Sequence, residues 1–491
     1  MKSYTKIIRE ALQDGGLLDA LLLLQERDGY VTEDALCALA QQQGVSLAEI
    51  YDTASFYSML KFSPDQSLWD VPVTEGVLGS GEGETRIALR NAGQIRPESI
   101  DDYIARCGYD ALNKARQMDR GELIEAIEEQ SRLRGRGGAA FPTGKKWASA
   151  YKSSAETKYI VVNADEGEPG TYKDRIIMES DPHTVIEGLL IGAYAVGAAE
   201  CFVYIRGEYP ESLRLMRLAV QQAEEKGLCR GVKIHVVSGA GAYICGEGTA
   251  IVNSLEGVRG EPRLKPPSMA VAGLHQKPTI VNNVETFAVI PEIVNKGAAW
   301  FGAIGAEKYP GTKLMCLSGD VANKVCVEVP TDTTLREILE LFGGGVAGGK
   351  QLKAIQLGGY SCGFVSPEQL DTSIDFDSVR AIGAALGSGA FEVLDESHNI
   401  VDYLLEIARF FRHESCGKCS PCREGTMRIE ELLRKIASGE GSWADVRLIE
   451  SLSDYMQKTC FCPLGQSATT AFRSALKLFP ADFEAKLGKE A

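Results

Sequence analysis

Five cysteines near the C-terminus have the spacing of an iron–sulfur site. Cys416, Cys419 and Cys422 form a C-x2-C-x2-C pattern, and Cys460 and Cys462 follow them in the segment CFCPLG. Three thiolates on one tight loop suit three corners of an iron–sulfur cube, and a distant fourth cysteine closes the site. Zinc is the main alternative, although zinc sites more often pair two separate C-x2-C knuckles. The pattern therefore predicts a cluster, with Cys460 and Cys462 competing for the fourth position.

A glycine-rich loop at residues 134–144, RGRGGAAFPTG, could approach a phosphate or an aromatic ring. It contains G-x-G-x-x-A, part of the dinucleotide-binding fingerprint, but it follows a predicted helix where that fingerprint requires a strand. A Rossmann interpretation therefore fails. The glycines still allow close backbone approach to a ligand, and Lys145 and Lys146 add positive charge to two arginines. A surface turn is the alternative.

Two further loops combine glycines with polar side chains. Residues 163–170, NADEGEPG, directly follow a strand-like run, the place where ligands bind in an α/β layer. Residues 239–249, GAGAYICGEGT, repeat the arrangement after another run, and Tyr243 could stack or hydrogen-bond there. Asn282 and Asn283 add a polar pair. Each loop alone also fits a solvated turn, but three glycine-bearing loops from one layer predict a shared pocket.

The elements that must hold these loops alternate between strand and helix. Strand-like runs at Tyr159–Val162, Phe202–Ile205 and Val232–Val237 are separated by helical patterns at 184–199 and 210–225. That alternation indicates an α/β layer with a largely parallel sheet.

The segments on either side of this layer have other patterns. Short strands and one helix within residues 311–365 predict a small α+β module, and the tail from residue 397 is helical with apolar stripes. Residues 7–57 have the pattern of a small all-α unit in which Thr32 and Ser46 begin helices. Residues 63–85 are rich in Gly, Asp and Pro and are the predicted linker.

Composition narrows the class of protein. The 491 residues carry a formal charge of −15, which disfavours nucleic-acid binding because phosphate-binding surfaces need concentrated Lys and Arg. The start of the chain has no apolar signal core, and the most apolar later run, Val185–Ala199, is short and interrupted by Glu187. We therefore expect a cytoplasmic protein without direct membrane insertion. Its thirteen cysteines argue for metal binding rather than disulfides.

These motifs together resemble the flavoprotein, NADH-binding subunit of respiratory complex I. The same pattern occurs in its soluble relatives in NAD-linked formate dehydrogenases, NAD(P)-reducing hydrogenases and electron-bifurcating enzymes. The resemblance runs from about Ile87 to the C-terminus. It rests on the segments RGRGGAAFPTG, NADEGEPG, GAYICGEGTA, PTIVNNVET, ESCGKCSPCREG and FCPLG.

The resemblance implies three sets of ligand-binding residues. Those that would bind FMN are Gly135, Arg136, Gly137, Lys146, Asn163, Asp165, Glu166, Gly246, Glu247, Asn282 and Asn283. Those near the nicotinamide nucleotide would be Gly138, Phe141, Glu168, Tyr243 and Gly248. The cluster ligands would be Cys416, Cys419, Cys422 and Cys462, because the family's fourth ligand directly precedes the Pro-Leu-Gly turn.

The resemblance also implies a fold: an α/β flavin-binding domain with a ubiquitin-like α+β module, a C-terminal helical bundle carrying an Fe–S cluster, and a small all-α N-terminal unit. The expected boundaries are 1–62 for the all-α unit, 63–85 for the linker, 86–310 for the FMN/NAD(P)-binding domain, 311–396 for the ubiquitin-like module and 397–491 for the bundle.

The N-terminal unit and two single positions depart from the family pattern. Residues 1–60 resemble the helical part of the complex's small [2Fe–2S] subunit, but the thioredoxin-like half is missing, and Cys37 and Cys107 cannot supply four ligands. A docking or stabilising role is therefore expected for them. Ala140 replaces a usual glycine, and Gly248 stands where relatives mostly carry a glutamate, which leaves the choice between NAD and NADP open.

The implied activity is that of an NAD(P)H dehydrogenase subunit in an oxidoreductase complex. Hydride would move between nicotinamide and FMN, and single electrons would move between FMN and a [4Fe–4S] cluster. No residue need transfer a proton, and Lys146 and Glu168 would act as pocket residues, with Lys146 stabilising negative charge on reduced flavin. The expected partners are a [2Fe–2S] small subunit and a larger Fe–S or catalytic subunit, such as a formate dehydrogenase or hydrogenase. The alternative is a non-catalytic scaffold that keeps the cluster without nucleotide turnover.

Overall fold

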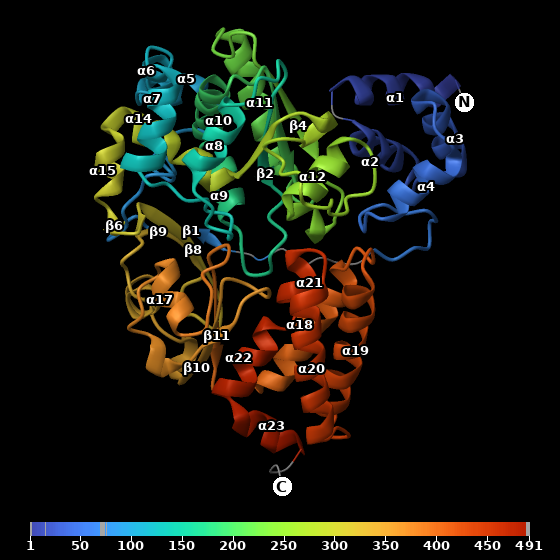
Figure 1. Ribbon diagram of the computed structural model, residues 1–491, viewed down its shortest axis with the longest axis vertical. Coiled ribbons are helices and arrows are strands. Elements are labelled where there is room, and N and C mark those ends of the chain that lie inside the picture. The colour runs from blue at the N-terminus through green and yellow to red at the C-terminus, as the bar shows by residue number, and fades with distance from the viewer. Residues whose placement is uncertain (1, 15, 69–73, 75, 488–491) are drawn as a thin grey trace.

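A four-stranded parallel sheet lies in the upper half of the molecule as Figure 1 shows it. The computed structural model describes residues 2–14, 16–68, 74 and 76–487. The strands follow the order β4-β3-β2-β5, with bounds β2 (Tyr159–Ala164), β3 (Glu200–Ile205), β4 (Lys233–Ser238) and β5 (Thr279–Asn283). The three predicted strand runs are β2, β3 and β4, and the polar segment TIVNN supplies the fourth strand. The register places Asn163 beside Asn283, so the two amides meet at the carboxyl edge of the sheet.

Side chains of this sheet alternate between two hydrophobic cores. Ile160 and Val162 of β2 belong to one core, and Tyr159 and Val161 belong to the other. This is the two-residue period of a strand that is covered on both faces. Both faces of the sheet therefore need a helical layer.

The first face is covered by α8 (Thr143–Tyr151), α10 (Pro182–Val196) and α11 (Pro210–Glu225). The Asp181 side chain caps α10 by accepting from Thr184 N, and Gly197 ends the helix with φ 79°. Glu187 interrupts the apolar run of this helix and is buried. It accepts hydrogen bonds from Tyr103 Oη at 2.5 Å and from the backbone N of Leu112 at 3.0 Å, so its carboxylate is satisfied inside the core.

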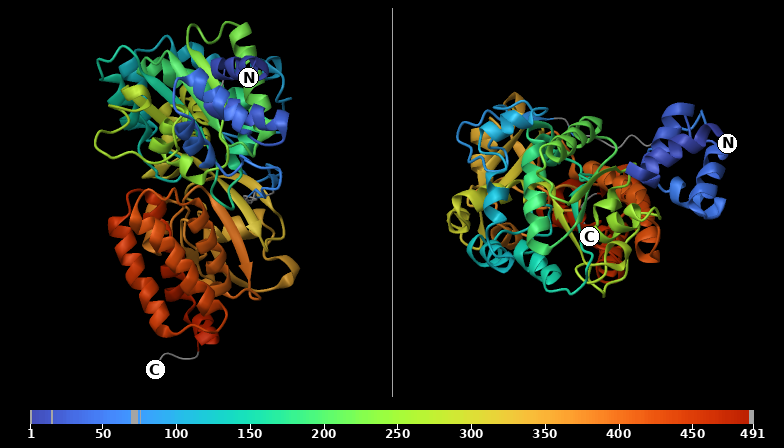
Figure 2. Two further views of the ribbon diagram at one scale, coloured as in Figure 1. Left: turned by 90° about the vertical axis from the view of Figure 1, so that its right-hand side faces the viewer. Right: turned by 90° about the horizontal axis from the view of Figure 1, so that it is seen from above.

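The second face shares a hydrophobic core with α12 (Gly248–Leu255) and with the N-terminal helices α1 (Lys2–Asp14), α2 (Leu17–Asp28), α3 (Glu33–Gln43) and α4 (Leu47–Ser55). Thr32 caps α3, and Ser46 forms a capping box with Glu49 at the start of α4, as the sequence predicts. Figure 2 shows these helices at one side of the molecule. Their apolar side chains share a core with the sheet, so this unit is packed onto the α/β layer.

A second, six-stranded sheet follows the order β1-β9-β8-β12-β10-β11. Its strands are β1 (Val77–Leu78), β8 (Thr312–Gly319), β9 (Val325–Pro330), β10 (Leu352–Leu357), β11 (Phe364–Val365) and β12 (Ala390–Asp395). The helix that packs on it, α16 (Leu335–Glu337) continued by η4 (Ile338–Phe342), begins with a capping box between Thr334 and Glu337. The expected linker contributes β1, which pairs in parallel with β9, and residues 69–73 and 75 of it lie outside the described part.

The C-terminal region is helical and lies beside the second sheet (Figure 1). Its elements are α18 (Ile400–Glu414), α19 (Ser420–Ala437), α20 (Trp443–Thr459), α21 (Pro463–Ser467), α22 (Thr470–Leu478) and α23 (Pro480–Leu487). Their apolar stripes form one core that also includes Ile244 and Ala250 of the α/β layer. None of the described helices is long and apolar enough to cross a bilayer.

Shorter elements fill the connections. The helices are α5 (Ile100–Ala105), α6 (Asp110–Ala115), α7 (Arg120–Glu125), α9 (Lys173–Ser180), α12 (Gly248–Leu255), α13 (Val284–Ala288), α14 (Ile290–Lys296), α15 (Ala298–Gly302) and α17 (Phe376–Ala381). Further turns and strands are η1 (Ala126–Gln130), η2 (Tyr243–Gly246), η3 (Leu274–Gln276), η5 (Ala347–Gly349), η6 (Pro367–Gln369), β6 (Gly305–Ala306) and β7 (Tyr309–Pro310).

Candidate functional site

A cavity of about 680 Å³ lies where the carboxyl edge of the parallel sheet meets the second sheet and the helical bundle. Ligand pockets usually enclose roughly 300–1,000 Å³. The predicted site residues that line it are Gly137, Gly138, Asn163, Asp165, Glu166, Glu168, Tyr243, Gly246, Glu247, Gly248 and Asn283. The structure thus brings the three glycine-bearing loops together around one space.

The first glycine loop lies against its neighbours at two glycines. A Cβ on Gly137 would lie 2.9 Å from the Cβ of Asn283. Gly138 has φ 120°, and a Cβ on it would lie 3.4 Å from Gly387 of the second-sheet loop. Ala140, where the resemblance expects glycine, has φ 50°, which costs an L-residue about 1–2 kcal/mol. The two glycines therefore allow a close approach, and Ala140 holds a strained turn.

The segment at the end of β2 is joined to the third glycine loop and to α9 by its amide and carboxylate groups. Asn163 Nδ2 donates to Gly246 O at 2.9 Å, and its Oδ1 accepts from Asp165 N at 3.1 Å. Glu166 accepts from Asp174 N at 2.9 Å, at the start of α9. Burial and the Asp174 carboxylate raise the pKa of Glu166 to about 7. These contacts fix the loop backbone at the edge of the sheet.

Asp165 is the side chain of this loop that keeps a free oxygen. Its Oδ2 is buried, and no residue in the described part of the chain hydrogen-bonds to it. Burial, and then the nearby Glu208 carboxylate, raise the pKa of Asp165 well above its usual range. A buried acceptor without a partner is costly unless a ligand satisfies it. The Asp165 oxygen is therefore a place for a ligand hydroxyl or ring N–H.

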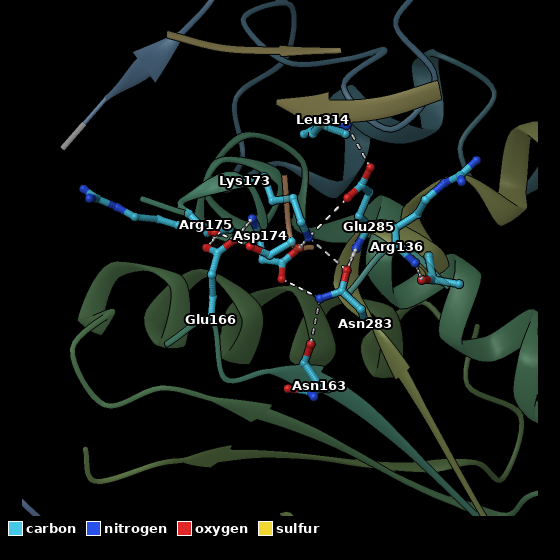
Figure 3. Close-up of polar contacts among 12 residues, drawn as sticks. Arg136, Asn163, Glu166, Lys173, Asp174, Arg175, Asn283, Glu285 and Leu314 are labelled. Atoms are coloured by element: carbon cyan, nitrogen blue, oxygen red, sulfur yellow. Dashed lines mark hydrogen bonds and ion pairs between the residues drawn. The ribbon is translucent and has the colours of Figure 1, made fainter. Parts of the chain in front are cut away.

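A buried charge network lies behind the cavity (Figure 3). Lys173 Nζ contacts Asp174 Oδ1 at 2.6 Å, Asn283 Oδ1 at 3.0 Å and Glu285 Oε2 at 3.2 Å. Asn283 Nδ2 donates to Asp174 Oδ2, and Lys313 Nζ contacts Glu285 Oε2 at 2.5 Å. Burial lowers the pKa of Lys173, but the Asp174 and Glu285 carboxylates outweigh it and raise that pKa. The network places a protonated lysine at the cavity wall.

Glu168 and Tyr243 form a second polar wall. Tyr243 Oη donates to Glu168 Oε2 at 2.5 Å, and Ser361 N donates to Glu168 Oε1 at 2.8 Å. Burial raises the pKa of Glu168. The Tyr243 ring packs edge-on against Phe410, with 5.1 Å between centroids. Glu168 is thus held between the α/β layer and the second sheet.

The third loop ends at the N-terminus of α12. Glu247 is the N-cap, and its Oε2 accepts from Thr249 N at 2.8 Å. Its Oε1 contacts Lys265 Nζ at 2.7 Å, and these partners lower the pKa of Glu247 against the raising effect of burial. A Cβ on Gly248 would lie 2.6 Å from Met269 Cε. A side chain at position 248 would therefore clash with Met269 unless the Met269 side chain moved.

Two predicted FMN residues of the first loop lie off the cavity lining. Gly135 N donates to Phe141 O at 2.9 Å within the loop. Arg136 is 1% exposed, and its Nη2 donates to Pro310 O at 2.6 Å. Its Nε and Nη1 have no hydrogen-bond partner among the residues that are described, and burial lowers its pKa. The guanidinium is therefore buried against Pro310 of β7 rather than at the cavity.

Three other predicted residues also lie outside the lining. Lys146 Nζ donates to Val281 O at 2.7 Å, and burial and Lys265 lower its pKa to about 8. Asn282 Oδ1 accepts from Trp147 Nε1 at 3.2 Å in the core. Phe141 is 51% exposed and lies at the surface.

Sequence reasoning missed several lining residues. They are Arg134, Thr171, Lys173, Asp174, Lys265, Tyr309, Ser361, Phe376, Arg380 and the loop at 384–388. The Lys173-Asp174 pair begins a helix only three residues after NADEGEPG, a signal that was open to sequence reasoning. The 384–388 loop carries only small residues and Leu386, and nothing in its own sequence marks it as ligand-binding.

A second, small cavity lies at the base of the helical bundle. The four cysteines that line it are Cys416, Cys419, Cys422 and Cys462, together with Ile244, Pro262, Lys418, Phe461 and Leu464. Cys460 follows the end of α20 and does not line this cavity. A hydrogen bond from the Cys460 thiol lowers the pKa of Cys422 to about 7. Cys460 Sγ also lies close to Gly465, since a Cβ on Gly465 would lie 2.6 Å from it. The cavity lining thus groups Cys462 with the three cysteines of the C-x2-C-x2-C loop, while Cys460 lies beside Cys422.

The spread of these sulfurs bears on the choice between zinc and a cluster. Tetrahedral zinc with Zn–S bonds of about 2.3 Å holds its sulfurs only about 3.8 Å apart. In the described part of the chain, three possible metal ligands lie within 4.8 Å of one another at Asp320, Asp395 and His398. The cysteines do not form a group of three or more that meets this criterion. The described cysteines therefore do not form a ligand group as compact as tetrahedral zinc requires.

Three family profiles match the chain. The profile "Nuo51 FMN-binding domain" matches residues 129–292, and "NADH-ubiquinone oxidoreductase-F iron-sulfur binding region" matches residues 402–486. "Thioredoxin-like [2Fe-2S] ferredoxin" matches residues 4–99, a range whose sequence contains one cysteine, Cys37. Within residues 63–99, the described part of the chain forms one strand, β1, and β1 pairs into the six-stranded sheet rather than into a separate thioredoxin-like sheet.

Curated relatives resemble the chain over most of its length. The second F-type subunit of the NADH-quinone oxidoreductase of Rhizobium meliloti is 47% identical over 410 residues, which cover 82% of this chain and 97% of the relative. The HndC subunit of the NADP-reducing hydrogenase of Solidesulfovibrio fructosivorans is 45% identical over 414 residues, covering 82% and 83%. A crystal structure of an NAD+-reducing [NiFe]-hydrogenase in the H2-reduced state has a TM-score of 0.82 at 27% identity, and the match covers 96% of this chain and 92% of that chain.

Proposed function

Because the chain belongs to the family of F-type subunits of NADH-quinone oxidoreductase, we propose that it is the NAD(P)H-oxidising or NAD(P)+-reducing flavo-iron–sulfur subunit of a multi-subunit redox complex. One observation carries this proposal. Ile244 and Leu464 line both the large cavity and the cysteine cavity, so a single layer of side chains separates the two. A flavin on one side and a cluster on the other could exchange electrons without a diffusible carrier.

The large cavity fits FMN. The free Asp165 oxygen can accept from a ligand hydroxyl or ring N–H, and Gly137 and Gly138 let the backbone approach a flat ring. Bound FMN would supply the exchange between hydride and single electrons. We propose that it is held by the lining residues Gly137, Asn163, Asp165, Glu166, Gly246, Glu247 and Asn283, with Gly135, Arg136, Lys146 and Asn282 supporting them from behind.

Buried charges would set the electrostatics of this pocket. Lys173 remains protonated between Asp174 and Glu285 and lines the cavity. Lys146, whose pKa is about 8, would keep its proton more firmly beside an anionic ligand. Preorganised positive charge of this kind stabilises negative charge on a reduced ring without reorganisation. Lys173 would therefore act from the cavity wall, and Lys146 from behind the lining.

The nucleotide would enter over Gly138, Glu168 and Tyr243. Gly138 leaves room for a second ring, and the Glu168–Tyr243 pair supplies fixed hydrogen-bonding groups at the cavity wall. Phe141, which is exposed, would contact the nucleotide near the mouth. Gly248 lacks a carboxylate that would repel the extra phosphate of NADP, so we propose use of both NADH and NADPH.

The cysteine cavity would hold the [4Fe–4S] cluster on Cys416, Cys419, Cys422 and Cys462. We further propose the boundaries 86–310, 311–396 and 397–491 for the flavin domain, a ubiquitin-like module and the bundle, after an all-α unit at 1–62 and the segment 63–85. The proposed partners are a [2Fe–2S] small subunit and a larger Fe–S or catalytic subunit, in the cytoplasm. Membership of a family of complex subunits supports this view.

The test is a reduction experiment on the full chain purified without oxygen. About four irons and a flavin spectrum that bleaches on addition of NADH or NADPH are expected. The non-catalytic scaffold role would be supported instead if the protein bound iron but no flavin, or bound flavin that neither nucleotide reduces. Arg217→Gln, at a position that lines neither cavity, is the matched control and should bleach like the natural protein.

A further inference from the structure

The turn that ends the N-terminal helical unit is hydrogen-bonded to the third glycine loop. Ser58 N and Met59 N donate to Gly241 O and Ala240 O, each at 3.0 Å, and Ser58 Oγ donates to Gly241 O at 2.8 Å. Gly241 has φ 80°, and a Cβ on it would lie 2.6 Å from Ser58 Oγ. The glycine therefore allows this turn to lie directly on the loop backbone.

A buried hydroxyl adds to the same contact. Tyr57 is 1% exposed, and its Oη donates to Ser254 Oγ of α12 at 2.9 Å. Ser254 also bonds to Tyr204 Oη of β3 at 2.9 Å. Between these two anchors the chain runs through Tyr243, Gly246 and Glu247, which line the large cavity. The N-terminal turn thus contacts the start of the cavity-lining loop at 240–248 and the helix that follows it, α12.

A second contact runs from the same unit to the cysteine loop. The Arg259 guanidinium lies over the Phe56 ring, 4.9 Å from its centroid, and its Nη1 contacts Asp52 Oδ1 at 3.4 Å. Its Nη2 donates to the backbone oxygen of Cys416 at 3.1 Å. One residue after Arg259, a Cβ on Gly260 would lie 3.2 Å from Tyr57 Oη. Arg259 therefore joins the N-terminal unit to a proposed cluster ligand.

We propose that the turn at residues 56–59 and Arg259 form a brace that holds the cavity-lining loop and the cysteine loop at a fixed separation. This rests on the proposed function, because the two loops would hold the flavin and the cluster. The N-terminal unit then acts as a positioning element inside its own chain, in addition to any contact with partners. Tyr57, Ser58 and Arg259 are positioning residues, since they line neither the large cavity nor the cysteine cavity.

The brace makes different demands on the two electron steps. Both electron steps use the cavity-lining loop, but electron passage to the cluster also depends on the separation of the two loops. Weakening the brace should therefore slow cluster reduction more than it slows flavin reduction.

The experiment compares Tyr57→Phe/Arg259→Gln with Arg217→Gln in the full, cofactor-loaded chain. Arg217 also joins the N-terminal unit to the α/β layer, through Asp19 at 2.9 Å, but it contacts neither loop. Rapid mixing with NADH follows flavin bleaching by absorbance and cluster reduction by EPR. Hydrogen–deuterium exchange of residues 240–248 in the FMN-free protein provides a readout that is independent of activity.

The double variant should show slower cluster reduction and faster exchange at 240–248, and Arg217→Gln should show neither. Unchanged cluster reduction in a double variant with full iron content would overturn the brace. If the double variant loses iron or does not fold, Arg259→Gln and Tyr57→Phe are measured singly, and natural rates in both would overturn it equally. Arg259→Lys, which keeps the charge but not the planar fork, should lie between Arg259→Gln and the natural protein. A natural protein without flavin or cluster would refute the proposed function instead.

Discussion

Replacing Asp165 by asparagine should weaken FMN binding and stabilise the FMN-free protein at the same time. One oxygen of the carboxylate is buried without a hydrogen-bond partner in the described residues. It therefore lowers the free energy of unfolding of the FMN-free protein and is available to a ligand. A charge-assisted hydrogen bond contributes about 1.5–3 kcal/mol, which corresponds to a loss of about 10-fold to 100-fold in FMN affinity. The backbone bonds of Asp165 to Asn163 Oδ1 and Gly167 N do not involve the side chain and should survive.

The pH dependence has a defined sign. Burial raises the pKa of Asp165, so the folded FMN-free protein holds this proton more tightly than the unfolded chain does. The free energy of unfolding therefore loses this contribution as the pH rises above the unfolded value of 3.8. Ligand donors favour the ionised form, so FMN binding should release protons and tighten with pH in the natural protein, but not in Asp165→Asn.

The assay is fluorescence titration of the FMN-free protein with FMN, combined with urea unfolding of the same protein. Asp181→Asn is the control, because both Asp181 oxygens have partners in Asn91 Nδ2 and Thr184 N. That variant should lower the free energy of unfolding and leave FMN affinity unchanged. An Asp165→Asn protein with natural FMN affinity, or with reduced stability, would refute the reasoning.

Cys462→Ser should lose or degrade the cluster while Cys460→Ser keeps it, as iron content and EPR would report; loss in Cys460→Ser alone would reverse the assignment. Gly248→Glu should raise the ratio of kcat/KM for NADH over NADPH, since a carboxylate repels the extra phosphate, and an unchanged ratio would contradict this. The Gly248→Glu variant also carries Met269→Ala to make room for the new side chain, because a Cβ at 248 would lie 2.6 Å from Met269 Cε. Burial lowers the pKa of His183 from 6.5 to about 4, so the unfolded chain takes up this proton first on acidification. The free energy of unfolding should fall by up to about 3 kcal/mol over that interval, and urea unfolding of His183→Asn should lack that loss.

The parallel sheet was predictable where its strands are continuous apolar runs. Residues 159–162, 202–205 and 232–237 are such runs, and they form β2, β3 and β4. The fourth strand, β5, has the sequence TIVNN and ends in two asparagines, so its sequence suggests a polar loop. Its place beside β2 depends on pairing between segments far apart in the chain, which local patterns do not contain.

The loops that form the cavity were predictable, but the placement of several individual side chains was not. Arg136 looks like a phosphate ligand in its glycine loop, yet its guanidinium is buried against Pro310 O. Lys173 lines the cavity because Asn283 and Glu285 approach it from another strand and helix. Ser388 meets Thr171 across 217 residues of sequence. Such convergence is a property of the tertiary fold, and no spacing within one loop encodes it.

The number of cysteines in the N-terminal unit limits its ability to bind a [2Fe–2S] cluster. A cluster of that kind needs four ligands, commonly cysteines, and residues 4–99 contain Cys37 alone, so similarity to a ferredoxin profile does not extend to cluster binding there. The helices still have a physical reason to persist. Tyr159, Val161 and Tyr204 of the sheet belong to the same hydrophobic core as the apolar side chains of these helices, together with Ile251 and Val252 of α12. Removing the helices would expose part of this shared core to water, so burial alone is a reason for them to be retained without a cluster.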